Sequence, residues 1–317
     1  MKYGIALICS ALIVYLIIPF LMKLSVKYGF LDKPTKRKKH RNPIPLCGGV
    51  GMFIGFFLIY FVMGGDFFPK EKVSIFIASL AILAIGMVDD FYKSRGKEFP
   101  IYPRLIVQIL AAILVYKSGI AFTGFTDPFT EQYVQLHVAL QFILTITWIF
   151  GVTTVINWSD GMDGLAGSLS AISSTTLFVV ALAMRQPDSA MICIILVGAI
   201  LGFLKYNRHP AKVFMGDSGA NFLGFILGII ALDGAFKQAT VLSLVIPILA
   251  LGVPIFDNIF VLFKRFSEGK PIYQADRSQI HFRLQEKGLT TNQVVLYICA
   301  ISLGLSIISL ILLFVKF

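Results

Sequence analysis

Two adjacent carboxylates followed by a lysine are the first group of residues suited to chemistry. Asp89 and Asp90 stand directly after an apolar run that ends at Val88, and Lys93 follows at a helical spacing. Adjacent carboxylates at the end of an apolar segment repel each other and are costly to desolvate, so they indicate a cation. That cation is either Mg²⁺ or a basic side chain, and Lys93 on the same face can hold a phosphate. An isolated Asp-Asp pair is also typical of a solvated helix end.

A second cluster combines one amide with two carboxylates at intervals of three residues. Asn157, Asp160 and Asp163 place three oxygen ligands on one side of a turn, and Gly161 and Gly164 permit tight backbone geometry there. The twelve-residue frame of an EF-hand loop is missing. Capping of the next helix is an alternative role for Asp163, but capping alone does not account for three polar ligands between two apolar segments.

A third cluster, Met215-Gly216-Asp217-Ser218-Gly219, leads into another apolar segment. A carboxylate at the start of a helix can bind a cation while the exposed backbone N–H groups face a phosphate. One glycine-rich turn is weak evidence, but three acidic turns of this kind strengthen one another.

The fourth cluster lies in the polar segment 264–292, which contains Arg277, His281 and Arg283. A loop of this length is more often functional than idle, and the planar guanidinium groups suit a pyrophosphate or a nucleotide. The basic run 33–41 predicts attachment to an anionic membrane surface, and it also suits a polyanionic substrate.

The composition identifies the kind of protein that must position these clusters. The 317 residues are 57% hydrophobic and 14% charged, with a net charge of +11, whereas soluble domains carry roughly 25% charged residues. An ordinary soluble enzyme is therefore excluded. The four cysteines show no spacing for a zinc site or a disulfide framework. We expect an all-α, polytopic integral membrane protein that forms one domain over residues 1–317.

A transmembrane helix needs about 20 apolar residues to cross about 30 Å of hydrocarbon. That length predicts about ten spans, at residues 3–22, 48–64, 73–88, 104–119, 134–155, 165–184, 189–205, 219–236, 240–263 and 293–315. The GxxxG spacing of Gly224 and Gly228 indicates close helix packing.

The basic residues predict which side of the membrane each loop faces. Ten spans place 21 of the 28 Lys and Arg residues in alternate loops, which makes those loops cytoplasmic and both termini external. All four clusters then lie on the cytoplasmic face. A transporter or flippase of a phosphorylated lipid or nucleotide sugar is the competing class, but it would carry ionisable residues at midplane, where only Asp257 near a helix end is found.

Taken in order, the clusters resemble those of the polyprenyl-phosphate N-acetylhexosamine-1-phosphate transferases, which form glycosyltransferase family 4. The resemblance rests on the paired Asp, the Asn-x-x-Asp-Gly-x-Asp-Gly run and Met-Gly-Asp-Ser-Gly, and it extends from residue 43 to about residue 290. The Asp276-Arg277 opening of the last loop is similar to the WecA/TagO-like branch, which is related to MraY. MraY-like enzymes, which use UDP-MurNAc-pentapeptide, remain an alternative.

The resemblance implies a ten- or eleven-helix enzyme of the bacterial cytoplasmic membrane. It would transfer a sugar 1-phosphate, with GlcNAc-1-phosphate as the first choice, from a UDP-sugar to undecaprenyl phosphate and release UMP. This is the first membrane step of cell-surface glycan synthesis, such as that of teichoic acid or O-antigen. The implied cofactor is Mg²⁺, with Mn²⁺ as an alternative. The implied partners are the two substrates and the bilayer, without nucleic acid, and a homodimer is compatible with the family.

The resemblance also implies a role for each matching residue. The catalytic set is Asp89, Asp90 and Asp160, the metal ligands are Asp217 and Asn157, and the substrate-binding set is Lys93, Asn157, Asp163, Arg277, His281 and Arg283. The branch usually carries His-x-His-His in the last loop, whereas this chain has Gln279-Ile280-His281-Phe282. The sugar that is bound therefore stays open.

Overall fold

The computed structural model describes residues 1–33, 42–64, 69–127, 130, 132–234, 241–271 and 277–314. Most of the basic run 33–41 and Asp276 lie outside these described residues. The helices are α1 (Lys2–Lys27), α2 (Gly48–Met63), α3 (Pro69–Ser94), α4 (Ile101–Ser118), α5 (Val138–Trp158), α6 (Leu165–Ala183), α7 (Pro187–Asn207), α8 (Gly216–Gly234), α9 (Val241–Ala250), α10 (Gly252–Ser267), α11 (Ile280–Glu286) and α12 (Thr291–Phe314).

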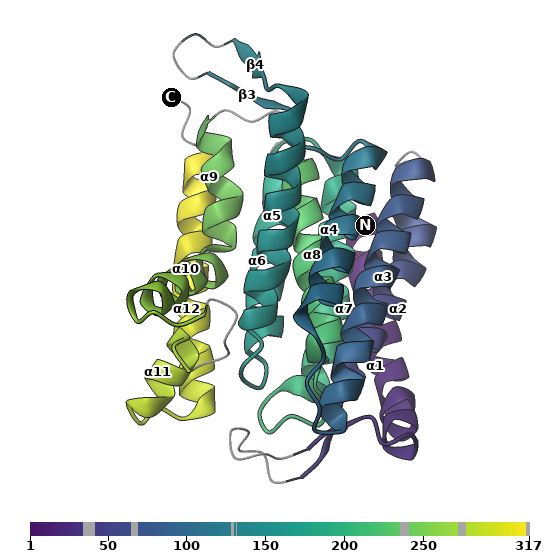
Figure 1. Ribbon diagram of the computed structural model, residues 1–317. Helices are drawn as coiled ribbons and strands as arrows, with labels where there is room; N and C mark the ends of the chain where they lie inside the picture. Colours follow the sequence, from purple (N-terminus) through teal and green to yellow (C-terminus); the bar gives the residue numbers. More distant parts are fainter. Residues whose placement is uncertain are drawn as a thin grey trace.

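The long helices run up and down one bundle, as Figure 1 shows. Within the described residues, seven helices are long and apolar enough to cross a membrane, and α2 is a shorter apolar helix. Two small antiparallel hairpins connect helices: β1 (Leu31–Asp32) pairs with β2 (Ile44–Pro45), and β3 (Gly124–Thr126) pairs with β4 (Tyr133–Gln135). The expected all-α, polytopic membrane fold is therefore confirmed.

The predicted span 240–263 is wrong as a single helix. It divides into α9, which ends at Ala250, and α10, which begins at Gly252 and lies at a steep angle to α9 (Figure 1). Pro254 has no N–H to donate to the Ala250 carbonyl, so a continuous helix would lose that hydrogen bond and clash there. The Ser173 hydroxyl donates to the Ala250 carbonyl instead, at 2.6 Å. The ten residues of α9 alone extend about 15 Å, roughly half of the hydrocarbon thickness.

Other boundaries also differ from the predicted spans. The predicted span 134–155 begins later, at Val138, because residues 133–135 pair in β4, and the His137 side chain caps α5 by accepting from the Ala139 N–H. At the opposite end of the bundle, α3 continues to Ser94, so Asp89 to Lys93 are helical.

The core of the bundle is built around α7 and α8. Both helices are largely apolar, and most residues of α7 and nearly every described residue of α8 are buried, which is expected for helices surrounded by others. Helix α7 packs against α1 and α6, and α8 packs against α5 and α3. In contrast, α1 exposes large apolar side chains such as Leu16 and Phe20, which fit a surface that faces lipid.

Glycines allow three helices to approach the backbone of α8. A methyl group on Gly224 would lie 2.7 Å from Cα of Thr153 in α5, so the GxxxG expectation of close packing is confirmed. A methyl group on Gly86 of α3 would lie 2.4 Å from Cα of Ser218, and one on Gly49 of α2 would lie 2.4 Å from the Gly219 nitrogen. These contacts place α3 and α2 directly against the first turn of α8.

We expect Gly86→Ala to destabilise the protein, because the added methyl group meets backbone atoms that cannot move independently of α8. Overpacking of this kind costs about 1–3 kcal/mol, which lowers the thermal unfolding midpoint of the purified protein by about 5 °C. The matched control is Gly304→Ala in α12, where a methyl group would have no neighbour within 4 Å. Equal midpoints for the two variants would contradict the close approach.

Candidate active site

The first and third clusters meet where the last turn of α3, the first turn of α4 and the first turn of α8 come together. Lys93 Nζ lies 2.6 Å from Oδ2 of Asp217 and 3.2 Å from Oδ2 of Asp89. Arg104 Nη1 lies 2.6 Å from Oδ2 of Asp89 and 3.4 Å from Oδ2 of Asp217. Two carboxylates from different helices therefore share two cations. The Asp89 side chain is only 1% exposed, whereas that of Lys93 is 38% exposed.

Asp90 points in another direction and binds the backbone of α8. Its Oδ1 accepts from the Asp217 N–H at 2.8 Å, and its Oδ2 accepts from the Ser218 N–H at 3.0 Å. The first N–H groups of a helix have no partner within the helix, so a carboxylate from α3 here caps α8 and interacts favourably with its dipole. Gly216, at φ +68°, leaves room for this carboxylate, because a methyl group there would lie 2.4 Å from Oδ2. Asp90 therefore positions Asp217.

The carboxylates of Asp89 and Asp217 fit a divalent cation. Asp89 Oδ1 is buried and has no hydrogen-bond partner, while both Oδ2 atoms face the same pair of cationic side chains. The described residues contain no group of three or more His, Cys, Asp or Glu side chains arranged to hold a metal ion. Mg²⁺ typically binds one or two carboxylates together with substrate phosphates, so a site of this size suits it.

Asn157 lies at the end of the α5–α8 interface that is nearest to Asp217. These antiparallel helices pair Ile149 with Gly228 and Thr153 with Gly224, so one further turn brings Asn157 level with Ala220, close to the first turn of α8. The turn 159–164 follows directly. Asp160 begins this turn, and its N–H donates to the Asn157 carbonyl at 3.2 Å.

Asp163 binds the segment that connects α7 to α8. Its Oδ2 lies 2.7 Å from Nδ1 of His209 and 3.1 Å from the Ala211 nitrogen, which donates to it. Helix α6 has Gly164 at its N-cap and no side-chain cap, so the alternative of Asp163 as the cap of α6 is wrong. The Asn207 side chain accepts from the Gly164 N–H at 2.9 Å and donates to the Val213 carbonyl at 2.8 Å. The second cluster is thus tied to the segment that leads to Asp217.

The fourth cluster reaches the second through His281. This residue lies on α11, is 1% exposed and packs so closely on Gly161 that a methyl group there would lie 2.0 Å from Nε2. Burial lowers the pKa of His281 to about 4, so the imidazole is neutral at pH 7. Its Nε2 is buried without a hydrogen-bond partner, which leaves one polar atom available beside the turn 159–164.

The two arginines of the last loop have different surroundings. Arg283 Nη2 lies 3.1 Å from Oδ1 of Asp257 in α10, and its guanidinium carbon lies 4.2 Å from the ring centre of Phe260. Asp257 also accepts from the Ile280 N–H, at 2.9 and 3.0 Å, so it holds the start of α11. Arg283 therefore connects α11 to α10. Arg277 is exposed and remains accessible to an anion. Its guanidinium carbon lies 5.1 Å from the ring centre of Phe282.

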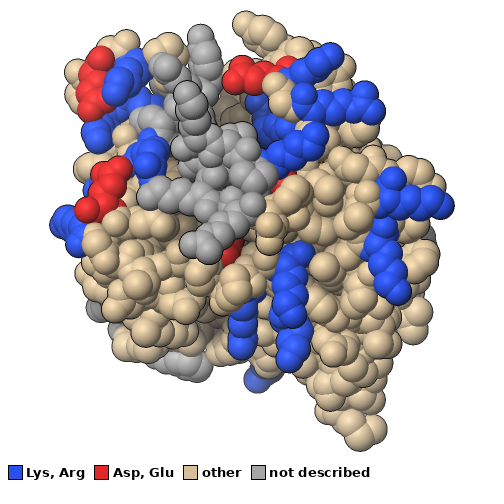
Figure 2. Space-filling view, turned by 90° about the horizontal axis from the view of Figure 1, so that it is seen from below, with Lys and Arg blue, Asp and Glu red and all other residues tan. Residues whose placement is uncertain are grey.

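Sequence reasoning missed Arg104 as a site residue and counted it only among the basic loop residues. The signal was present, because a lone arginine in the first turn of a helix opposes the helix dipole and needs a nearby anion. Figure 2 shows the lower face of the bundle, where blue Lys and Arg side chains outnumber the red Asp and Glu. That excess of positive charge favours anionic substrates.

Several known proteins are similar in sequence to this chain. The model of glycosyl transferase family 4 matches residues 72–235, just over half of the chain. A probable undecaprenyl-phosphate N-acetylglucosaminyl 1-phosphate transferase of Bacillus subtilis (strain 168) is 36% identical over 97% of this chain and 84% of its own length. The chain belongs to glycosyltransferase family 4. The resemblance inferred from the four clusters is thereby confirmed.

Two further relatives are similar over most of this chain. A phospho-N-acetylmuramoyl-pentapeptide-transferase of Listeria monocytogenes serovar 1/2a is 30% identical over 97% of this chain and 95% of its own length. An undecaprenyl-phosphate alpha-N-acetylglucosaminyl 1-phosphate transferase of Escherichia coli (strain K12) is 26% identical over 86% of this chain and 74% of its own length.

We expect Gly161→Ala to displace α11, because the methyl group would enter the space of the His281 ring. Amide hydrogen exchange of residues 280–286 in the purified protein should then become faster, by about tenfold or more. The control is Gly151→Ala in α5, where a methyl group would have no neighbour within 4 Å. Unchanged exchange in Gly161→Ala would show that α11 does not depend on this contact.

Proposed function

We propose that this protein transfers a sugar 1-phosphate from a UDP-sugar to undecaprenyl phosphate, forming undecaprenyl-pyrophosphoryl-sugar and UMP. The observation that carries the proposal is the cluster of Asp89, Asp217, Lys93 and Arg104 at one end of a membrane bundle. Such a site can receive phosphates of a lipid and of a water-soluble nucleotide at the same surface. The names of the family members in Bacillus subtilis and Escherichia coli support this reaction and favour UDP-GlcNAc as the donor.

The central difficulty of the reaction is electrostatic. A phosphate monoester has a second pKa of about 6, so at pH 7 the lipid phosphate is mostly a dianion and needs no strong base. Its attack on a pyrophosphate brings two polyanions together, and positive charge at the site lowers that barrier. Lys93 and Arg104 supply this charge and orient the two phosphates. Mg²⁺ held by Asp217, with Asp89 and Asn157 nearby, would add charge and polarise the pyrophosphate.

The transfer itself forms one bond and breaks one bond. An oxygen of the lipid phosphate attacks the sugar-bearing phosphorus in line, and the bridging oxygen leaves with UMP. The glycosidic bond is untouched, so the sugar keeps its anomeric configuration. In this scheme Asp89 faces the reacting phosphates, either as a base or by organising charge. Asp90 acts through α8, as a positioning residue for Asp217.

The nucleotide would lie between the turn 159–164 and the last loop. His281 with its unpaired Nε2, Asp160 and the accessible guanidinium of Arg277 border this region. Asp163 and Arg283 support it indirectly, by holding the segment after α7 and helix α11. UDP-MurNAc-pentapeptide is the second candidate donor, because the Listeria monocytogenes relative is named for the transfer of phospho-N-acetylmuramoyl-pentapeptide.

We further propose that the site faces the cytoplasm and that both termini are external. The distribution of 21 of the 28 Lys and Arg residues supports this orientation, as does the positive face in Figure 2. A water-soluble UDP-sugar would then meet the lipid acceptor at the inner surface of the bacterial cytoplasmic membrane.

We expect the purified protein, given undecaprenyl phosphate, Mg²⁺ and UDP-GlcNAc, to release UMP. Asp217→Asn should reduce the rate by about 100-fold or more, because it removes the carboxylate that would hold Mg²⁺ and that positions Lys93 and Arg104. UDP-GalNAc and UDP-MurNAc-pentapeptide tested in parallel identify the donor. Absence of UMP release above the Asp217→Asn level with every donor would refute the transferase function.

Chelation with EDTA should abolish the activity, and Mg²⁺ should restore it.

We expect Arg104→Gln to lower kcat by about 10- to 100-fold, because one of the two charges that neutralise the phosphates is lost. Arg104→Lys should retain more activity, since it keeps the charge but loses the planar guanidinium. The control is Arg95→Gln, because Arg95 lies on the same face with its guanidinium carbon 4.2 Å from the ring centre of Phe91. If Arg104→Gln and Arg95→Gln had the same kcat, Arg104 would have no part in catalysis.

A further inference from the structure

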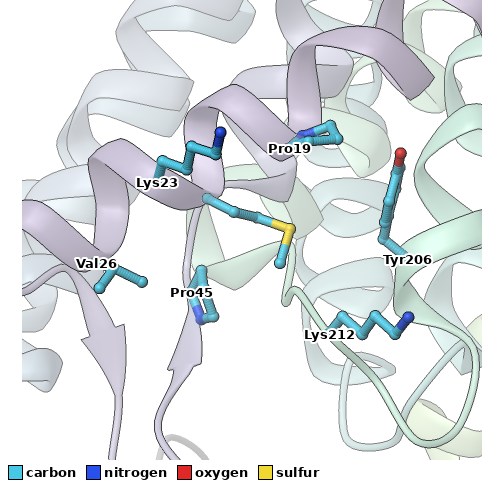
Figure 3. Close-up of a pocket in the computed structure, with 7 residues that line it drawn as sticks. Pro19, Lys23, Val26, Pro45, Tyr206 and Lys212 are labelled. Atoms are coloured by element: carbon cyan, nitrogen blue, oxygen red, sulfur yellow. The ribbon is translucent and has the colours of Figure 1, made fainter.

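An apolar groove of about 540 Å³ lies between α1, β2 and the end of α7, outside the cluster of Asp89 and Asp217. Its apolar wall is formed by Pro19, Met22, Val26 and Pro45. Two exposed lysines also line it, Lys23 from α1 and Lys212 from the segment after α7, so they approach the groove from different elements (Figure 3).

The groove lies at the membrane boundary on the same side as the site. Lys23 is one turn before the end of α1, and Lys212 lies between the end of α7 and the start of α8. The preceding turns of α1 expose Leu16 and Phe20, at 69% and 60%, which fit a surface in contact with acyl chains. The groove is therefore continuous with the lipid-facing surface of α1, and two lysines border it.

The charge pattern selects the occupant. An apolar groove flanked by two lysines matches a molecule with an aliphatic chain and an anionic headgroup, and no acidic residue is among the described residues that line it. Lysine beside an anionic membrane lipid is favourable, because its ammonium group interacts with the phosphate while its stem lies along apolar atoms.

The groove is also connected to the segment that presents Asp217. The Lys212 N–H donates to the Tyr206 carbonyl at 2.8 Å, and the Phe214 N–H donates to the Pro45 carbonyl at 2.9 Å. Pro45 and Lys212 thus border the groove and also hold residues 212–216 in place. A molecule that contacts both would restrict the motion of this segment, and with it the first turn of α8.

We propose that this groove binds one anionic phospholipid of the surrounding leaflet, with its phosphate at Lys23 and Lys212 and an acyl chain along Pro19, Met22 and Val26. The bound lipid stabilises the segment that precedes Asp217. This groove lies outside the cluster of Asp89 and Asp217, and its occupancy does not depend on the proposed transferase reaction.

Native mass spectrometry of the detergent-purified protein tests the binding. Phosphatidylglycerol should bind more tightly than phosphatidylcholine, and the double variant Lys23→Gln/Lys212→Gln should weaken phosphatidylglycerol binding about 30-fold. The matched control is Lys27→Gln/Lys205→Gln, which removes two exposed charges from α1 and α7 outside the groove. Equal affinities in the two double variants, or equal binding of the two lipids to the unmodified protein, would overturn the proposal.

Hydrogen exchange in nanodiscs tests the stabilising effect without relying on enzyme activity. Replacing part of the phosphatidylcholine by phosphatidylglycerol should slow amide exchange at residues 212–217 in the unmodified protein and in the control double variant, but not in Lys23→Gln/Lys212→Gln. Inorganic phosphate in phosphatidylcholine nanodiscs should have no effect, because it lacks the acyl chain. The same slowing by free phosphate, or no slowing by phosphatidylglycerol, would refute the lipid site.

Discussion

The capping of α8 by Asp90 is the interaction on which the arrangement of the site depends. The carboxylate belongs to α3, but both of its oxygens accept from the first N–H groups of α8. This contact requires that the two helices nearly touch, and Gly86 and Gly216 leave the space for it. Asp217 is then held where Lys93 and Arg104 can reach it. A paired Asp motif thus combines a residue that faces the cations with one that fixes the opposite helix.

The turns at this end of the bundle support one another through similar contacts. Asp163 holds the segment after α7, Asn207 connects that segment to Gly164, and His281 packs on Gly161. Each contact joins residues that are distant in sequence, so the site is assembled only when α3, α4, α5, α7, α8 and α11 are all in place. A change in the position of one turn is therefore expected to shift the others. A lipid that contacts residues 212–216 would act on the site in the same way.

Much of the fold could be predicted because a membrane span has a simple length and polarity requirement. The predicted spans 165–184 and 189–205 differ from α6 and α7 by a few residues only. The span 240–263 failed because apolarity alone does not report a break. Pro254 removes one helical donor, and the Ser173 hydroxyl binds the Ala250 carbonyl that is left without it. Residues 134 and 135 were assigned to a span for the same reason, since strand β4 depends on pairing with β3.

The amino-acid sequence by itself determined the membrane character, the excess of basic residues on alternate loops and the presence of three acidic clusters, because these follow from residue type and spacing. Only the tertiary structure decided which partner each side chain meets. Asp90 binds an opposite helix, Arg283 pairs with Asp257, and Arg104 joins the carboxylates of Asp89 and Asp217. Helical periodicity places a residue on a face, but the neighbour on that face depends on how closely and in which register two helices pack.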